Sequence, residues 1–337
     1  MSTLTVSLPD IQSAATRIRG HIVTTPLLES PLLNKELGFR LLIKAENLQR
    51  TGSFKVRGAF NQIAQLTEDE KRKGVIAISS GNHAQAVAYA ATAFGVKSTI
   101  VMPKDAPRLK LENTKRYGAE VVTYNRDDEE REDVGGRLAR ERGLRMIHPY
   151  DDPRTIAGQG TCGIEIFEQT KALGFAPDAI IVNCSGGGLA AGIAVTRELY
   201  GATKPQIYTS EPEQFDDMKR SLASGTPVRN QKTSGSICDA LMAVTPGAVP
   251  FPILVQNKAQ GLAASEACVE AAMSVAAEYF KLVLEPGGAV SLACACLNRD
   301  LFRGKTVVAV SSGGNVDPDA YVGMLERGYK NRNLLFT

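Results

Sequence analysis

The chain has 337 residues, of which 43% are hydrophobic, and its formal net charge is +3. This length allows one large domain or two ordinary domains with a sizeable core. The nearly balanced charge, without a block of basic residues, gives no support for nucleic-acid binding. No apolar run reaches the ~20 residues of a membrane-spanning helix.

The six cysteines lie mostly in apolar contexts, and none belongs to a Cys-x-x-Cys pair. Only three histidines are present and metal-ligand spacing is absent, so a structural zinc site is not expected. Residues 1–4 lack the basic start and apolar core of a secretory signal. We therefore expect reduced core thiols and a cytoplasmic location.

The first part of the chain predicts a helix over residues 10–20 and a strand over 40–45. A helix with one apolar side is expected over 54–66. The motif Ser53-Phe54-Lys55-Val56-Arg57-Gly58-Ala59 follows that strand and overlaps the start of that helix. Considered alone, Lys55 resembles one of many solvated lysines, so its role depends on the rest of the chain.

From residue 74, short apolar strands alternate with helices, which is typical of a parallel sheet with covered faces. We expect residues 73–146 to form a small domain, and residues 1–72 with 147–337 to form a large domain. The small-domain strands are expected at 75–78, 98–102, 120–124 and 145–147, with helices ending at 94 and spanning 108–117 and 128–142. The mixed-charge run 126–133 is interpreted as the solvated face of a helix.

A second alternating series predicts the sheet of the large domain. Its strands are expected at 179–184, 206–210, 282–284 and 306–310, and its helices at 156–173, 189–200, 264–280, 288–298 and after the last strand. The predicted fold class is α/β, with two open parallel-sheet domains. Ligands bind such sheets at the carboxyl ends of strands, so the cleft between the domains is the expected site.

The clearest candidate at a strand end is Ser185-Gly186-Gly187-Gly188-Leu189, which lies between a strand and a helix. Three glycines and the free N–H groups of a helix start suit a phosphate, although a packing cluster of glycines is the alternative. No Lys-Ser/Thr pair follows, as a Walker A loop requires, and the spacing differs from G-x-G-x-x-G.

Three other strand ends carry polar residues. Residues 79–83 and 311–315 could be simple turns or helix caps, although a Ser312 hydroxyl could face a ring nitrogen. Residues 211–217 are dense in carboxylates, which suit a hard cation or a solvated acidic loop equally well. The clustering of these segments after buried strands favours a ligand between the two domains.

Together, Ser53-x-Lys55-x-Arg57-Gly58-Ala59, Ser80-Gly81-Asn82-His83, the glycines 186–188 and Ser312-Gly313-Gly314-Asn315 resemble the serine/threonine dehydratase and serine racemase family. The order and spacing match over almost the whole chain. The resemblance implies a fold-type II pyridoxal-phosphate enzyme with a tryptophan synthase β-like fold, and a homodimer.

The resemblance also implies roles for individual residues. Lys55 would carry pyridoxal 5'-phosphate as a Schiff base, and Ser80 occupies the position of the second acid/base of the racemases. Further cofactor contacts are implied for Phe54, Asn82, Ser185, Gly186, Gly187, Gly188, Leu189, Glu285 and Ser312. Substrate contacts are implied for Ser79, Ser80, Gly81, Asn82, His83, Tyr150 and Asp239. A divalent cation (Mg, Ca or Mn) would be held by Glu211, Asp217 and the carbonyl of Phe215.

Two details favour elimination. Tyr150 stands where mammalian-type racemases have an asparagine and is similar to the dehydratases, and a serine at position 312 cannot protonate a ring nitrogen as an aspartate would. We predict dehydration and deamination of a β-hydroxy amino acid, L-threonine or L-serine first, to a 2-oxo acid and ammonia. A neutral Lys55 would take the Cα proton.

Several alternatives stay open at this point. Serine racemase or 3-hydroxyaspartate dehydratase activity would use the same scaffold, and β-replacement occurs in cysteine synthase-like relatives. A non-catalytic ligand-binding protein is the alternative outside enzymes. The segment Ser236-Ile237-Cys238-Asp239-Ala240 lacks the family's usual Ala-Asp-Gly, and this stretch lies near the substrate in relatives.

Overall fold

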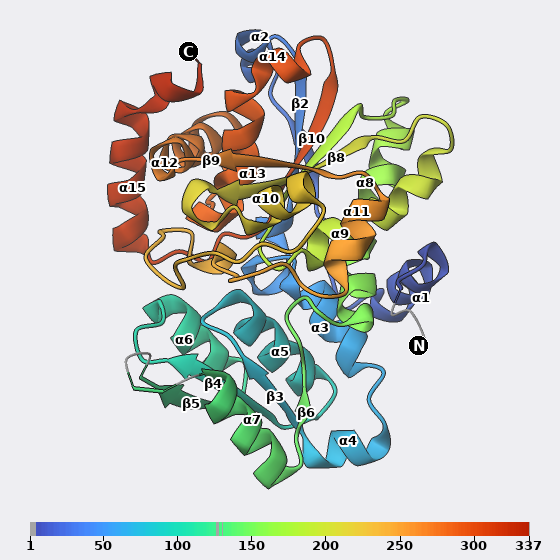
Figure 1. Ribbon diagram of the computed structural model, residues 1–337, viewed down its shortest axis with the longest axis vertical. Coiled ribbons are helices and arrows are strands. Elements are labelled where there is room, and N and C mark those ends of the chain that lie inside the picture. Colours follow the sequence, from blue (N-terminus) through green and yellow to red (C-terminus); the bar gives the residue numbers. More distant parts are fainter. Residues whose placement is uncertain (1–4, 126–127, 130, 337) are drawn as a thin grey trace.

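The computed structural model describes residues 5–125, 128–129 and 131–336. Two sheets form two lobes that lie one above the other (Figure 1). The four-stranded sheet has the order β5-β4-β3-β6, and the six-stranded sheet has the order β1-β2-β10-β7-β8-β9. We call the first sheet with its helices the small lobe, and the rest the large lobe. The predicted α/β class is therefore confirmed.

All strand pairs of the small lobe are parallel, as the alternation of strands and helices predicted. Residues 126, 127 and 130 belong to the predicted charged helix face 126–133, and residue 130 also belongs to the predicted helix 128–142. All three lie outside the described residues. The small lobe contains β3 (Val75–Ile78), α5 (Asn82–Ala93), β4 (Ser98–Pro103), α6 (Arg108–Arg116), β5 (Glu120–Tyr124), α7 (Arg131–Arg142) and β6 (Arg145–Met146).

The sheet of the large lobe is parallel except for its first strand. That strand, β1, runs antiparallel to β2, with Leu27 opposite Lys44. Each of the remaining strand pairs is parallel. The strands are β1 (Leu27–Glu29), β2 (Arg40–Ala45), β7 (Ala179–Asn183), β8 (Gln206–Pro212), β9 (Gln260–Ala264) and β10 (Thr306–Ser311).

Helices cover both faces of this sheet (Figure 1). Successive strand residues point to opposite faces, so Val307 of β10 joins the core under α12 and α13, whereas Val308 joins the core under α8 and α9. The helices outside the small lobe are α1 (Leu8–Ile18), α2 (Pro31–Leu37), α3 (Lys55–Ile63), α4 (Glu68–Lys73), α8 (Pro153–Ala172), α9 (Gly188–Thr196), α10 (Asp217–Ser224), α11 (Pro250–Gln256), α12 (Glu266–Val275), α13 (Pro286–Leu297), α14 (Arg299–Phe302) and α15 (Pro318–Lys330).

One predicted strand is wrong, and two strands were missed, β1 at one edge of the large sheet and β9 at the other. Residues 282–284 form no strand: Leu282 and Leu284 are buried under the neighbouring helices, but Val283 is half exposed and none of the three residues belongs to a sheet. Strand β9 forms the edge of the sheet beside β8, and it was missed because its glycine and alanines have weak strand propensity. Gly261 of β9 is required there, because a Cβ would lie 2.3 Å from the Lys219 Cα of α10.

Two long predicted helices end earlier than expected. The helix predicted over 264–280 stops at Val275 and continues as the π turn Ala276–Phe280, and the helix predicted over 189–200 ends with the 3-10 turn Arg197–Tyr200. All six cysteines are free and buried, which confirms the prediction of core thiols. Within the described residues, no helix combines the length and the apolar character needed to cross a membrane.

Candidate active site

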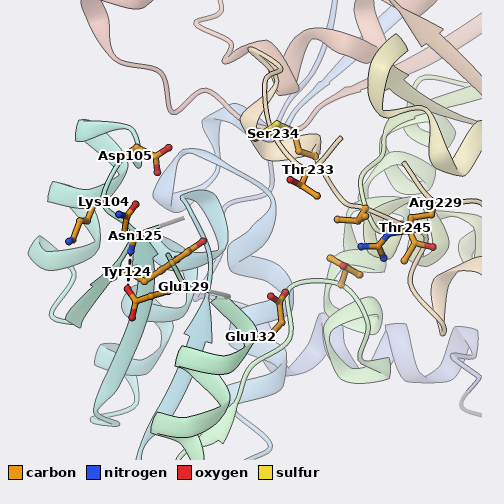
Figure 2. Close-up of a pocket in the computed structure, with 13 residues that line it drawn as sticks. Lys104, Asp105, Tyr124, Asn125, Glu129, Glu132, Arg229, Thr233, Ser234 and Thr245 are labelled. Atoms are coloured by element: carbon orange, nitrogen blue, oxygen red, sulfur yellow. Dashed lines mark hydrogen bonds between the residues drawn. The ribbon is translucent and has the colours of Figure 1, made fainter. Parts of the chain in front are cut away.

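A cavity of about 360 Å³ lies between the two lobes. The small lobe lines it with residues 78–83, Lys110, Glu132, Gly136 and Met146, and the large lobe with Lys55, residues 148–150, Ser185 and Asp239. Outside it lies a wider cleft of about 840 Å³, where Figure 2 shows small-lobe side chains facing those of residues 229–245. Both spaces share Glu132, Tyr150 and Met242, so the cleft is the mouth of the cavity.

Lys55 stands at the start of α3 and reaches the cavity. The chain before it is fixed to the end of β10, because the Phe54 N–H donates to the Ser312 carbonyl at 3.1 Å and Ser53 forms a bridge with Gly313. The Lys55 Nζ donates to the Pro149 carbonyl at 2.9 Å. Desolvation lowers the pKa of Lys55 to about 8. A much larger fraction of this amine is therefore neutral near pH 7 than in a solvated lysine.

Arg57, close behind Lys55 in the same helix, anchors α3 in a buried ion network. Its guanidinium bonds both carboxylate oxygens of Glu46 at 2.7 Å and those of Glu165 at 2.7 and 2.9 Å. The Lys44 ammonium lies 2.6 Å from Glu165. Two cations and two carboxylates thus balance, and they tie α3 to β2 and α8.

The glycine loop between β7 and α9 has the features of an anion cradle. Helix α9 begins at Gly188 without a capping side chain, so the first N–H groups of the helix lack the usual partner. Gly187 has φ +99°, a left-handed conformation that favours glycine. The Tyr150 ring packs on this loop, because a Cβ at Gly186 would lie 2.3 Å from its ring atoms.

Ser312 is oriented by an amide below it. The Asn183 Nδ2 donates to the Ser312 Oγ at 3.0 Å. Since that oxygen accepts a bond from Asn183, its own O–H stays available as a donor. Ser312 thus offers a neutral donor directly after β10, and its contact with a ring nitrogen stays a prediction.

Asn82 and Glu285 meet across the two lobes. The Asn82 Nδ2 donates to the Glu285 Oε1, and the Asn82 Oδ1 accepts from Asn315 at 2.9 Å, so the amide of Asn82 has one orientation. Glu285 has almost no exposed surface. Burial raises the pKa of Glu285 and the neighbouring Asp239 adds to this, while Lys110 opposes it.

Residues 79–83, which we call the substrate loop, open helix α5. The Ser79 Oγ accepts from the Gly81 N–H at 3.1 Å, and Gly81 caps α5 without a side-chain bond. The imidazole of His83 lies 2.9 Å from the Ile147 carbonyl through Nε2, which must therefore donate. Burial lowers the pKa of His83 to about 3, with Lys55 adding to the shift, so this histidine is a neutral part of the cavity wall.

Lys110 is a charged site residue that sequence reasoning missed, and it also missed Glu132 and Met242, which line the cavity as well. Lys110 is almost fully buried and lies 2.8 Å from Asp239 and 2.8 Å from Glu285. The surrounding Arg108-Leu109-Lys110-Leu111-Glu112 has the mixed charges of a solvated helix. No signal within that window separates Lys110 from its exposed neighbours.

The acidic segment after β8 forms a separate buried cluster. The Glu211 carboxylate accepts the N–H groups of Met218 at 3.0 Å and Lys219 at 2.8 Å, and burial raises its pKa, with Asp217 adding to the shift. Burial raises the pKa of Asp217 to about 7, and its Oδ2 has no hydrogen-bond partner among the described residues. Phe215 is buried beside them. Among the described residues, no group of three His, Cys, Asp or Glu side chains could hold a metal ion.

These features fit pyridoxal phosphate. The uncapped start of α9 suits its phosphate, the lowered pKa of Lys55 suits covalent attachment, and Ser312 and Asn82 are oriented donors for the ring. Of the predicted residues, Lys55, Ser79, Ser80, Gly81, Asn82, His83, Tyr150, Ser185 and Asp239 line the cavity. The remaining predicted cofactor residues lie outside that lining, namely Phe54, Gly186, Gly187, Gly188, Leu189, Glu285 and Ser312. Phe54 adjoins Lys55, and its N–H donates to the Ser312 carbonyl. Gly186 and Gly188 contact Tyr150, and Glu285 contacts Asn82.

Residues 18–313 match the family model described as "Pyridoxal-phosphate dependent enzyme". The chain is 41% identical to an L-threo-3-hydroxyaspartate ammonia-lyase of Saccharomyces cerevisiae, over 94% of this chain and 95% of that protein. It is 36% identical to a serine racemase of Schizosaccharomyces pombe, over 94% of this chain and 97% of that protein.

Solved structures give the same picture. A threonine deaminase from T.th. superposes with a TM-score of 0.85 at 41% identity, and covers 92% of this chain and 99% of its own. A maize serine racemase superposes with a TM-score of 0.88 at 32% identity, and covers 98% of this chain and 99% of its own. These similarities extend over both lobes and the cavity between them.

Proposed function

The chain belongs to the pyridoxal-phosphate dependent enzyme family, and from this premise we propose that it dehydrates and deaminates L-threonine or L-serine. It is an ammonia-lyase type enzyme that catalyses β-elimination from a β-hydroxy amino acid. The products of that reaction are a 2-oxo acid and ammonia.

One observation carries the choice of chemistry. Lys55, with its lowered pKa, opens into the same cavity as the uncapped start of α5. A neutral amine can accept a proton, and a helix start with free N–H groups can seat a carboxylate. An α-amino acid whose carboxylate lies at the substrate loop would therefore present its Cα to this amine.

The cofactor would be held at four points by this chain. Lys55 is the attachment point, the loop 185–189 would bind the phosphate, Ser312 would donate to the ring nitrogen, and Asn82 would contact the ring hydroxyl. When bound, pyridoxal phosphate supplies an electron sink for charge that develops at the substrate Cα.

The protein's own contribution is orientation and proton transfer. Lys55, as a neutral amine, would take the Cα proton, because desolvation disfavours its charged form. The backbone N–H groups and hydroxyls of residues 79–82 hold the carboxylate. Ser312 would donate a hydrogen bond to the ring nitrogen without protonating it, so the ring would withdraw less electron density than a ring that an aspartate keeps protonated, and this favours prompt loss of the β-hydroxyl.

3-Hydroxyaspartate is the second candidate substrate. Two relatives, from Saccharomyces cerevisiae and a Pseudomonas species, carry the name L-threo-3-hydroxyaspartate ammonia-lyase and are 41% and 40% identical to this chain. A racemase side activity has a separate basis, because Ser80 lines the same cavity as Lys55 and could act as the second acid/base.

We also propose a divalent cation at Glu211, Asp217 and the Phe215 carbonyl. Buried carboxylates with raised pKa values and an unpartnered Asp217 Oδ2 support this, since a cation would supply the missing partner. The cation would brace the segment after β8 and take no part in the proton transfer.

Three further expectations remain proposals. The two lobes would be the domains 73–146 and 1–72 with 147–337, as their separate sheets suggest. The chain would act as a homodimer, and the exposed Leu48 and Val283 are available apolar contacts for it. Six free buried thiols fit the reducing cytoplasm.

The test is an ammonia-release assay of the purified holoenzyme with L-threonine, L-serine and both diastereomers of 3-hydroxyaspartate, with and without a chelator. Release from one of these substrates, with loss of activity in Lys55→Ala, is the expected result. Solvent deuterium at the Cα of recovered serine tests racemisation, and no exchange excludes it. A protein without a visible absorption band, unchanged by borohydride, would contradict the enzyme assignment.

A further inference from the structure

Lys110 belongs to the small lobe, but its charge is balanced by the large lobe. Its Nζ lies 3.0 and 2.8 Å from the two carboxylate oxygens of Asp239 and 2.8 Å from the Glu285 Oε2. Only 2% of the Lys110 side chain is exposed. Asp239 lies in the 3-10 turn Asp239–Leu241, and Glu285 immediately precedes α13. One buried ammonium therefore joins helix α6 to two separate segments across the cleft.

The same side chain supports the substrate loop. A Cβ at Gly81 would lie 2.3 Å from the Lys110 Cδ, so the aliphatic part of the lysine passes directly against that glycine. Its charged end fixes Glu285, which in turn accepts from Asn82. Lys110 thus reaches the loop at two points, directly through Gly81 and through Glu285 at Asn82.

The charges explain why this arrangement depends on the ammonium. Asp239 and Glu285 both face Lys110; Glu285 is buried and the Asp239 side chain is 25% exposed, and two such carboxylates repel each other when no cation lies between them. Loss of the ammonium would leave these like charges adjacent at the boundary of the lobes. Protonation of Glu285, whose pKa burial already raises, or separation of the lobes would relieve that repulsion, and in either case α6 is no longer held to these two segments.

We propose that Lys110 is a positioning residue, which ties the small lobe to Asp239 and Glu285 and thereby sets the substrate loop opposite Lys55. The proposal deepens the ammonia-lyase function, and its kinetic test rests on that function. If the tied arrangement is the one that binds substrate, the apparent dissociation constant rises in inverse proportion to the fraction of molecules in that arrangement.

The experiment compares Lys110→Met with Lys115→Met, in which an exposed lysine of the same helix is replaced. Amide hydrogen exchange of the resting holoenzyme should become faster at residues 79–83 and 236–243 in Lys110→Met and stay unchanged in Lys115→Met. With the substrate that the wild type converts, KM should rise at least about tenfold while kcat changes less. Lys110→Arg, which retains the positive charge, should recover part of both effects.

Unchanged exchange at both segments in Lys110→Met, or a fall in kcat at constant KM, would overturn the proposal. Faster exchange throughout the chain without recovery in Lys110→Arg would indicate a general structural role and would overturn it as well. If Lys110→Met does not fold, Asp239→Asn keeps the shape of one anchor and removes its charge, and the same two segments must exchange faster. A wild type that releases no ammonia would refute the proposed function, whereas the exchange measurement tests the tie independently.

Discussion

Replacement of Arg57 by methionine tests whether the buried ion network holds the helix that carries Lys55. The substitution removes bonds of 2.7 to 2.9 Å to Glu46 and Glu165 and leaves two carboxylates with Lys44 alone. Breaking a buried pair by removing one partner costs about 3–5 kcal/mol, since a buried charge stays uncompensated. We expect Arg57→Met to lower the free energy of unfolding by about that amount.

The matched control is Arg72→Met, which removes the same charge from the surface. Arg72 pairs with Asp69 at 3.0 Å, but 71% of its side chain is exposed. Such a pair contributes about 0–1 kcal/mol. Chemical denaturation of both variants measures the difference. Equal losses in the two variants would refute the claim that the Arg57 network is what fixes α3.

The pH dependence and a second substitution sharpen this test. Burial alone would raise the pKa of Glu46, but Arg57 reverses the shift and holds this pKa below its usual value of 4.5. A lowered folded-state pKa adds stability above about pH 4.5 that is lost as the pH falls through the folded-state value. The deficit of Arg57→Met should therefore shrink below that pH. Adding Glu46→Gln should restore part of the loss, because it removes one uncompensated carboxylate.

Three other outcomes are expected. Lys55 of the apoprotein should react with an amine-directed reagent at a rate that rises about tenfold per pH unit up to about pH 8 and then levels off. The reason is that the pKa of Lys55 is lowered to about 8. A reaction rate that continues to rise up to about pH 10 would contradict this. Gly187→Ala should weaken cofactor binding in a spectrophotometric titration, since a Cβ there meets the Met218 Cε at 2.7 Å, whereas Gly201→Ala, also at positive φ but with open space, should not. Calcium or magnesium should raise the melting temperature of the wild type and leave Glu211→Gln unchanged; an equal rise in both would place the cation elsewhere.

The sequence predicted best those elements whose signal is local. The strands at 40–45, 75–78 and 120–124 have the predicted bounds, because each is a short run that is rich in apolar residues and bounded by turn signals. Strand β9 was missed because its residues have little strand propensity, and its pairing with β8 stabilises it instead. Residues 282–284 were wrongly predicted as a strand because they form a short apolar run, and Leu282 and Leu284 are apolar since they pack beneath helices, not since they belong to a sheet.

The site shows the same division between local and distant information. The motif at Lys55 and the glycine loop are recognisable because a tight turn or a helix start demands particular residues at fixed spacing. Lys110 gave no signal, since its burial depends on Asp239, 129 residues further along the chain. A window of a few residues contains the side chain but not the carboxylate that neutralises it.

This division bears on the balance between elimination and racemisation. Lys55 is fixed by the large lobe through Arg57 and the end of β10, whereas Ser80 belongs to the small lobe. Each group could be identified from its own motif, but the distance between them depends on contacts that join the lobes, such as Lys110 with Glu285. Both reactions need the substrate loop opposite Lys55, but proton delivery to the Cα from a second side also needs the Ser80 hydroxyl itself within reach of the Cα. A change at the lobe boundary should therefore alter racemisation more than elimination, even though neither motif is touched.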